Sequence, residues 1–91
     1  MSVVISGATG GIGASIVEKY ASSGINLFLL GKSKRKLEKM SNLMQKKYNV
    51  EISYFLYDMK KENTVHSAIK KIIKATDTID CLINNAGIFP Y

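Results

Sequence analysis

Cysteine is almost absent from this sequence: one residue, Cys81, stands among 91. No disulfide can therefore form within the chain. Cys81 lies in the apolar run Cys81-Leu82-Ile83, and we expect it to act as a small hydrophobic side chain rather than a reactive thiol. A chain without disulfides suits a reducing compartment, so the cytoplasm is the expected location.

Long apolar runs are absent as well. The longest, over residues 25–30, is interrupted by Asn26, and a bilayer-spanning helix needs about 20 apolar residues. No positively charged segment with a long apolar stretch precedes the first apolar run, so the sequence predicts no secretory signal and no membrane partner. It also contains no internal repeat and no low-complexity segment.

Acidic residues are outnumbered by basic ones, seven against 13, which gives a net charge of +6. The densest basic cluster contains Lys32, Lys34, Arg35, Lys36 and Lys39. No zinc-ligand spacing, helix-turn-helix pattern or aromatic-rich motif accompanies it, and most lysines fall on the outer faces of predicted helices. We therefore expect a solvated basic surface and no nucleic-acid partner.

The sequence does contain a regular alternation of strand and helix patterns. Short apolar or β-branched runs predict four strands, over residues 3–5, 27–30, 50–57 and 79–84. Apolar residues at helical spacing predict three helices between them, with Gly24 ending the first and Ser33 capping the second. The expected buried faces of these helices are Ile12, Ile16, Val17 and Ala21; Leu37, Met40, Leu43, Met44 and Tyr48; and Val65, Ala68, Ile69, Ile72 and Ile73.

This order, βαβαβαβ, predicts the α/β class with a parallel sheet and right-handed crossovers. The doubly wound (Rossmann-type) arrangement places the strands in the order 3-2-1-4, with the first two helices on one face and the third on the other. We expect residues 1–91 to form one unit whose sheet is truncated after the fourth strand. That strand should then be an exposed apolar edge.

A glycine-rich turn, residues 6–13, joins the first predicted strand to the first helix. Gly7, Gly11 and Gly13 allow the backbone to approach a ligand closely, and the helix N-terminus behind them attracts anions. The position between strand and helix favours a dinucleotide pyrophosphate as the ligand. The alternative is a tight turn that binds nothing.

Three motifs in this order resemble the short-chain dehydrogenase/reductase family. Ser6-Gly7-Ala8-Thr9-Gly10-Gly11-Ile12-Gly13 is similar to the family's Thr-Gly-x-x-x-Gly-x-Gly, with Ser in place of Thr. Asp58, followed by Met59, resembles the family's adenine-contacting Asp, and Asn84-Asn85-Ala86-Gly87 matches its fourth-strand motif. The resemblance covers the whole chain but only the N-terminal, NAD(P)-binding part of a typical member.

The resemblance implies an oxidoreductase that transfers a hydride between a nicotinamide cofactor and a small carbonyl or alcohol substrate, with oligomers possible for the complete enzyme. The cofactor-binding residues that it implies are Gly7, Ala8, Thr9, Gly10, Gly11, Ile12, Gly13, Gly31, Lys32, Ser33, Asp58, Met59, Asn84, Ala86 and Gly87.

The end of the second predicted strand favours NADP(H) over NAD(H). NAD enzymes usually carry an acidic residue there, whereas this chain has Gly31 followed by Lys32, whose ammonium would attract a 2′-phosphate. Ser33 adds a hydroxyl. Two observations weigh against the preference: Lys lacks the bidentate fork of Arg, and Gly10 stands where many NADP(H) members carry a second basic residue. A lysine that is merely solvated is the alternative.

The family's catalytic Ser, Tyr and Lys lie beyond the Asn-Asn-Ala-Gly motif, where this chain has only residues 88–91. We expect no catalytic residue here and an inactive fragment; a nucleotide-binding module or a non-functional remnant is the alternative. Tyr57 and Lys61 fit the family's Tyr-x-x-x-Lys signature literally, but Tyr57 ends a predicted strand, so we interpret the match as coincidental. His66 lacks companions at ligand spacing, and we expect no metal site.

Overall fold

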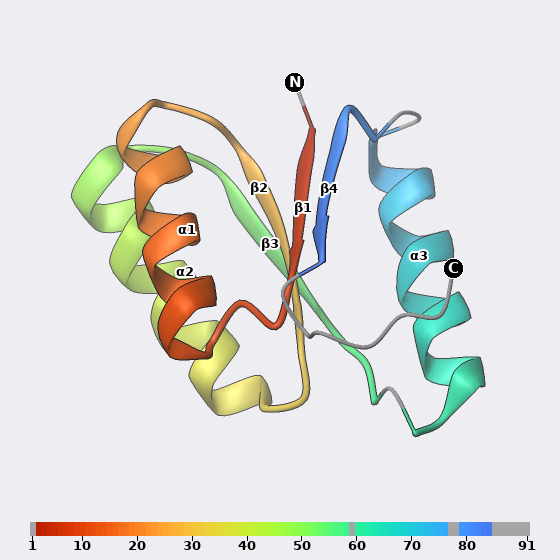
Figure 1. Cartoon of the computed structure of the whole chain (residues 1–91). Coiled ribbons are helices and arrows are strands. Elements are labelled where there is room, and N and C mark those ends of the chain that lie inside the picture. The colour runs from red at the N-terminus through yellow and green to blue at the C-terminus, as the bar shows by residue number, and fades with distance from the viewer. Residues whose placement is uncertain (1, 59, 77–78, 85–91) are drawn as a thin grey trace.

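The computed structural model describes residues 2–58, 60–76 and 79–84, without the side chains of Glu62, Val65 and Asn84 (Figure 1). Within these residues, strands and helices alternate strictly along the chain. They are β1 (Val3–Ser6), α1 (Gly11–Ser22), β2 (Leu27–Gly31), α2 (Lys34–Tyr48), β3 (Ile52–Leu56), α3 (Glu62–Thr76) and β4 (Cys81–Asn84).

The four strands form one parallel sheet in the order β3-β2-β1-β4, which confirms the predicted order. Helices α1 and α2 cover one face of this sheet, and α3 covers the other (Figure 1). Ser6 pairs with Leu30 and with Asn84, while Gly31 pairs with Leu56. The carboxyl ends of the strands therefore lie at one edge of the sheet.

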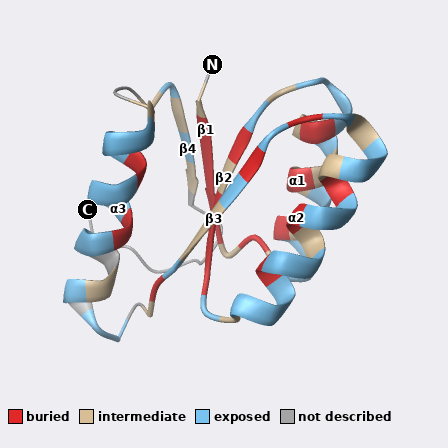
Figure 2. Cartoon of the chain, turned by 180° about the vertical axis from the view of Figure 1, so that it is seen from behind, coloured by how far each residue is buried: buried red, intermediate tan, exposed pale blue. Residues whose placement is uncertain are grey.

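Each face of the sheet carries its own core, because side chains along a strand alternate between the faces. Val3 and Ile5 belong to the larger core under α1 and α2, whereas Val4 belongs to the smaller core under α3. All four residues of β1 are buried, as a central parallel strand requires (Figure 2). The smaller core consists of Val4, Leu30, Tyr57, Ala68 and Ile72.

The predicted helix boundaries have identifiable causes in the structure. The Ser33 hydroxyl accepts a hydrogen bond from the Lys36 N–H at 3.3 Å, which confirms Ser33 as the N-cap of α2. Gly24, with φ of +80°, follows α1 in a left-handed conformation that favours glycine. Strands β3 and β4 are shorter than predicted, since β3 begins at Ile52 rather than Val50 and β4 at Cys81 rather than Ile79, whereas β1 and β2 each extend one residue further than predicted.

Several apolar side chains that helical periodicity predicted to be buried are exposed. Ile12 is 71% exposed, because the first turn of α1 adjoins the glycine turn rather than the packed middle of the sheet. Leu43 is 56% exposed, whereas Leu37 and Met44 on the same helix are buried. On α3, Ile69 and Ile73 are exposed as well. Among the described apolar side chains of this helix, those of Ala68 and Ile72 alone are buried.

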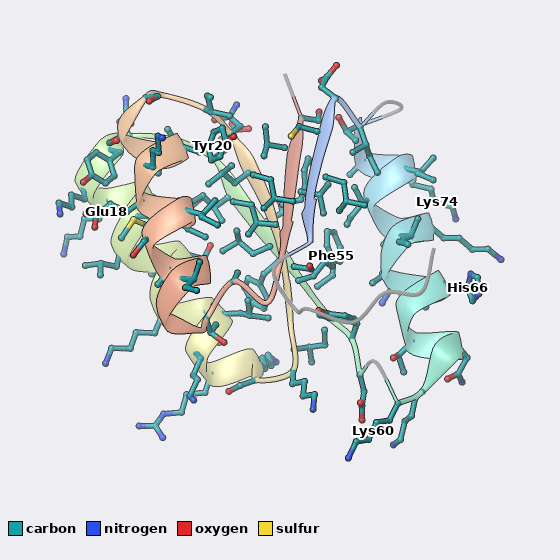
Figure 3. The ribbon with its side chains drawn as sticks, in the orientation of Figure 1. Glu18, Tyr20, Phe55, Lys60, His66 and Lys74 are labelled. Carbon is teal, nitrogen blue, oxygen red and sulfur yellow. The ribbon has the colours of Figure 1, made fainter. Side chains whose placement is uncertain are left out.

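A polar contact joins the two helices of the larger layer. The Glu18 carboxylate of α1 accepts hydrogen bonds from Lys47 Nζ and from the Tyr48 hydroxyl of α2, each at 2.7 Å (Figure 3). The hydrogen bond from Lys47 contributes most to a lowered pKa of Glu18. The pair is solvated, so it fixes the orientation of α1 on α2 more than it stabilises the fold.

Strand β4 presents an apolar edge. It pairs with β1, no strand among the described residues pairs with its other side, and Leu82 is 54% exposed. Unpaired apolar edges recruit other chains, so we expect the 91-residue chain to self-associate in a concentration-dependent way. Leu82→Lys should raise the monomer fraction in sedimentation velocity.

The matched control is Leu43→Lys, which removes an equally exposed leucine from α2, on the other side of the sheet from the α3 layer. It should leave self-association unchanged. A wild-type chain that sediments as a monodisperse monomer and melts in one sharp transition would contradict the prediction.

Candidate functional site

The connections that leave β1, β2 and β3 meet at the carboxyl edge of the sheet. The glycine turn follows β1, Lys32 and Ser33 follow β2, and Tyr57 and Asp58 follow β3. Ligands of open α/β sheets bind beyond this edge. The structure thus brings together three segments that are far apart in the sequence.

The glycine turn is held against the end of β2. Gly7 has φ of +61°, in the left-handed region, which favours glycine at this point of the turn. The Gly10 N–H donates to the Gly7 carbonyl at 3.3 Å, and the Ala8 N–H donates to the Leu30 carbonyl at 3.3 Å. These bonds close the turn and fix it beside β2.

The N-terminus of α1 has no side-chain cap. Its N-cap, Gly10, has no side chain to cap the helix, and the first turn contains no acidic residue. The first intrahelical bond runs from the Ala14 N–H to the Gly10 carbonyl at 2.8 Å. The N–H groups of the first turn have no acceptor within the helix, and their dipoles favour negative charge.

Two neighbouring hollows open at this edge. The glycine-turn hollow, about 390 Å³, is lined by Gly7, Thr9, Gly31, Lys32, Ser33, Lys36 and Tyr57. The α3-side hollow, about 210 Å³, is lined by Lys32, Leu56, Tyr57, Asp58, Lys61 and Thr64. Lys32 and Tyr57 line both, so the two hollows lie side by side across the ends of β1, β2 and β3, and together they are called the groove.

Three lysines face this groove. Lys32, which was predicted at the end of the second strand, lines both hollows; Lys36 lines the glycine-turn hollow, and Lys61 lines the α3-side hollow. Lys36 lies three residues after the N-cap Ser33, on the first turn of α2. That spacing was the signal in the sequence that could have placed it beside Lys32.

Gly31 packs closely against α2. A Cβ at this position would meet the Leu37 side chain at 3.3 Å, which is closer than ordinary contact. Glycine therefore lets the end of β2 approach α2. The groove consequently has no side chain, and no carboxylate, at this point of its wall.

Tyr57 lies at the boundary between core and groove. Its side chain is 5% exposed, and its N–H donates to the Gly31 carbonyl at 3.0 Å. Burial raises the pKa of the Tyr57 hydroxyl, and hydrogen bonds with the Ser6 side chain and the Gly7 backbone offset part of that rise. Tyr57 and Lys61 come from the connection between β3 and α3, so they do not share a helix, as the catalytic pair of the family would.

Asp58 closes a short turn beside the α3-side hollow. Its carboxylate accepts a hydrogen bond from the Lys60 N–H at 3.0 Å, and its own N–H donates to the Thr64 hydroxyl at 2.8 Å. These contacts fix the carboxylate in the hollow's wall. An adenine amino group is a donor that such a carboxylate can accept from.

The structure gathers some of the predicted cofactor-binding residues and not others. Gly7, Thr9, Gly31, Lys32 and Ser33 line one hollow, and Asp58 lines the next. Ala8 and Gly13 are buried, whereas Gly10, Gly11 and Ile12 are exposed at the start of α1. Asn84 ends β4 beside Ser6; Met59, Ala86 and Gly87 lie outside the described residues.

Other features of the described residues carry no chemistry of their own. They contain no group of three His, Cys, Asp or Glu side chains that could hold a metal ion. His66 and Lys74 lie on the outer face of α3 (Figure 3). Cys81 is half-buried against the larger core. None of the helices in these parts of the chain has the length and apolar content to span a membrane.

The family model described as short chain dehydrogenase matches residues 1–90. Hydroxysteroid dehydrogenase-like protein 1 of Gallus gallus is 37% identical over 86 residues, which cover 94% of this chain and 26% of that protein. The 3-oxoacyl-[acyl-carrier-protein] reductase FabG of Aquifex aeolicus is 33% identical, over 93% of this chain and 34% of that protein. The chain spans about a quarter to a third of the length of these relatives.

Another relative is named as inactive. Inactive hydroxysteroid dehydrogenase-like protein 1 of Homo sapiens is 34% identical over 97% of this chain and 27% of that protein. Among solved structures, L-sorbose reductase from Gluconobacter frateurii, complexed with NADPH and L-sorbose, has a TM-score of 0.88 at 25% identity, over 98% of this chain and 34% of that one. A short-chain dehydrogenase from Sphingobium yanoikuyae in complex with NADPH has a TM-score of 0.84 at 29% identity, over 96% of this chain and 34% of that one.

Proposed function

The chain belongs to the short-chain dehydrogenase family, and on that premise we propose that its groove binds the adenosine and phosphate end of NADP(H). Residues 1–91 then form the N-terminal part of an NAD(P)-binding domain. The complete protein is an oxidoreductase that acts on a carbonyl or alcohol. Bound NADP(H) supplies or accepts the hydride, and the residues described here bind and orient it.

The observation that carries this proposal is the pair of lysines in the glycine-turn hollow. Lys32 leaves the end of β2 and Lys36 the first turn of α2, and both line the same space. Gly31 leaves that space without a carboxylate, and Ser33 adds a hydroxyl. Two ammonium groups and no acid suit a 2′-phosphate better than the free ribose hydroxyls of NAD(H).

The charge at the start of α2 supports the same ligand. Lys34, Arg35 and Lys36 stand in its first turn, which contains no acidic residue. Cations at a helix N-terminus oppose the helix dipole, and an anion bound there offsets that repulsion. The NADPH complexes of two structural relatives agree with this choice of cofactor for the family.

The rest of the groove suits the rest of the nucleotide. We propose that the N–H groups at the start of α1 receive the pyrophosphate. The α3-side hollow, with the Asp58 carboxylate in its wall, would receive the adenine. Some cofactor contacts stay predictions. Those predicted because they lie at the start of α1 are Gly10, Gly11, Ile12 and Gly13. Those predicted from the resemblance to the family are Met59, Asn84, Ala86 and Gly87. A cytoplasmic location and an oligomeric complete enzyme also stay predictions.

A second candidate is a nucleotide-binding protein without catalysis. The observation that favours it is the name of the human relative, which marks that protein as inactive. Both candidates require the groove to bind the nucleotide, so binding tests what they share. Turnover by the complete protein would separate them.

We expect the 91-residue chain to bind NADPH weakly and NADH more weakly still. These 91 residues do not supply the family's contacts to the nicotinamide end of the cofactor, and each contact that is not made lowers the affinity. The residues proposed to bind the 2′-phosphate end are among the 91. The measurement is a titration followed by amide chemical shifts, and 2′,5′-ADP should compete with NADPH. A chain that binds none of these nucleotides would refute the proposed function.

We expect no oxidation of NADPH above background by the same chain. Reduction of a carbonyl needs a proton donor beside the substrate oxygen, and the Ser-Tyr-Lys set of the family does not occur in these 91 residues. The assay follows NADPH absorbance with a panel of ketones and aldehydes. Turnover that Tyr57→Phe abolishes would mean that the Tyr57 and Lys61 pair was wrongly rejected; turnover that survives would mean that a catalytic group was missed.

A further inference from the structure

Both the backbone and the side chain of Tyr57 are held in place by neighbouring elements. Its N–H donates to the Gly31 carbonyl at 3.0 Å, which extends the pairing of β3 with β2 by one residue. Its ring packs in the smaller core with Val4, Leu30 and Ile72. The position of the ring is therefore set by the sheet and by α3, independently of the glycine turn.

The Tyr57 hydroxyl reaches the end of β1, although β2 lies between β1 and β3 in the sheet. It forms hydrogen bonds with the Gly7 backbone and with the Ser6 side chain. Ser6 Oγ also donates to the Ile83 carbonyl of β4 at 3.3 Å. One side chain thus links the ends of β3 and β1, and through Ser6 the link continues to β4.

These hydrogen bonds connect three segments of the chain. The Ser6 hydroxyl carries one proton, which is directed to the Ile83 carbonyl. The Gly7 N–H donates to the Tyr57 hydroxyl, because a hydrogen bond that lowers the pKa of a tyrosine stabilises its ionised oxygen. This relay runs from Gly7 through Tyr57 and Ser6 to Ile83, and no buried side-chain polar atom among the described residues lacks a partner.

The relay ends at the residue on which the glycine turn depends. Gly7 has the left-handed conformation that starts the turn, and it lines the glycine-turn hollow together with Tyr57. Tyr57 and Lys32 are also the two residues that the glycine-turn and α3-side hollows share. A shift of Gly7 relative to Tyr57 would change the distance between the proposed pyrophosphate and adenine sites.

We propose that Tyr57 is a positioning residue whose hydroxyl holds the glycine turn in register with the ends of β2 and β3, so that the groove fits a nucleotide without rearrangement. This rests on the proposed function, because it assigns Tyr57 a role in that nucleotide site. In the sequence, Tyr57 and Lys61 fit the family's catalytic signature, a match that was interpreted as coincidental. The structure gives the hydroxyl a different task, at the adenosine end.

Tyr57→Phe tests the hydroxyl alone. Phenylalanine keeps the ring in the smaller core and the floor of both hollows, but it removes the hydrogen bond between the hydroxyl and the Gly7 backbone. The matched control is Tyr54→Phe: Tyr54 is on the same strand, packs against the larger core and lines neither hollow. Thermal melts and amide spectra of both variants check that they fold.

Two readouts are needed on the full 91-residue chain. The first is amide hydrogen exchange at Gly7, which should be about tenfold faster in Tyr57→Phe and unchanged in Tyr54→Phe. The second is the affinity for 2′,5′-ADP, which should fall about tenfold in Tyr57→Phe and stay at the wild-type value in the control.

The outcomes are distinguishable. Unchanged exchange at Gly7, or faster exchange with wild-type affinity for 2′,5′-ADP, would overturn the positioning role and leave the proposed function intact. Equal losses of affinity in both variants would also overturn it, because the effect would then be a general loosening of the fold. A wild-type chain that binds neither NADPH nor 2′,5′-ADP would overturn the proposed function, and the positioning role with it.

Discussion

Lys32→Asp is expected to weaken NADPH binding about 100-fold while NADH binding stays within about threefold of the wild type. The substitution removes one of the two ammonium groups that line the glycine-turn hollow. It also places a carboxylate at the end of β2, where it repels a 2′-phosphate and can accept hydrogen bonds from the ribose hydroxyls of NADH.

The size of the effect follows from two contributions. A hydrogen bond between charged groups contributes about 1.5–3 kcal/mol. Lys32→Ala removes only this bond, so it should weaken NADPH binding by roughly tenfold or more. The repulsion between carboxylate and phosphate adds to that loss, partly screened because position 32 is exposed. Lys36→Ala should give a loss similar to Lys32→Ala, since both lysines line the same hollow.

Lys34→Asp is the matched control. It makes the same change of charge on an exposed residue two positions further, which lines the outer surface of α2 with Glu38 and Asn42 instead of the groove. It should weaken NADPH only slightly. The measurement is a titration of each variant with NADPH and NADH at fixed ionic strength. Equal losses for the two cofactors in Lys32→Asp would remove the 2′-phosphate from this hollow.

The largest expected change in stability is that of Ile72→Ala, about 3–4 kcal/mol in the free energy of unfolding. Ile72 is 0% exposed at the centre of the smaller core. Truncation leaves a cavity between α3 and the sheet, and no other helix among the described residues packs on that face to fill it. A small domain has about 5–15 kcal/mol in total, so the variant should lose much of its cooperative transition.

Ile73→Ala is the matched control for this prediction. It removes the same atoms from the neighbouring residue of α3, whose side chain is 47% exposed. It should cost less than about 1 kcal/mol, because little of that surface is taken from water on folding. Urea unfolding followed by circular dichroism measures both. Equal losses in the two variants would mean that α3 does not pack on the sheet through Ile72.

Loss of α3 would also open the nucleotide groove on one side. Lys61 and Thr64 line the α3-side hollow from the connection into α3 and its first turn. Ile72→Ala should therefore weaken 2′,5′-ADP binding only to the extent that the chain unfolds or α3 detaches from the sheet. This separates a defect in folding from the direct effects expected of Lys32 and Lys36.

Local patterns in the sequence were enough for the elements and their order. Ser33 was identified as an N-cap and Gly24 as a helix end, because capping and left-handed turns depend on residues within a few positions of each other. The alternation of strands and helices was enough for the strand order β3-β2-β1-β4, since crossover handedness leaves few alternatives. The glycine turn between β1 and α1 was found in the same way.

The depth of each side chain was decided by the tertiary structure. Ile12 and Leu43 fit the apolar period of their helices and are nevertheless exposed, because periodicity gives a direction on a helix but not the extent of the surface that the helix packs against. The length of β3 and β4 was likewise set by how far their neighbours pair with them.

The composition of the groove also came only from the tertiary structure. By itself the sequence determined that a glycine turn precedes a helix and that Lys32 follows a strand. The tertiary structure decided that Lys36, Tyr57 and Lys61 join them. These residues belong to different connections, and they meet only because parallel pairing brings the carboxyl ends of β1, β2 and β3 to one edge of the sheet.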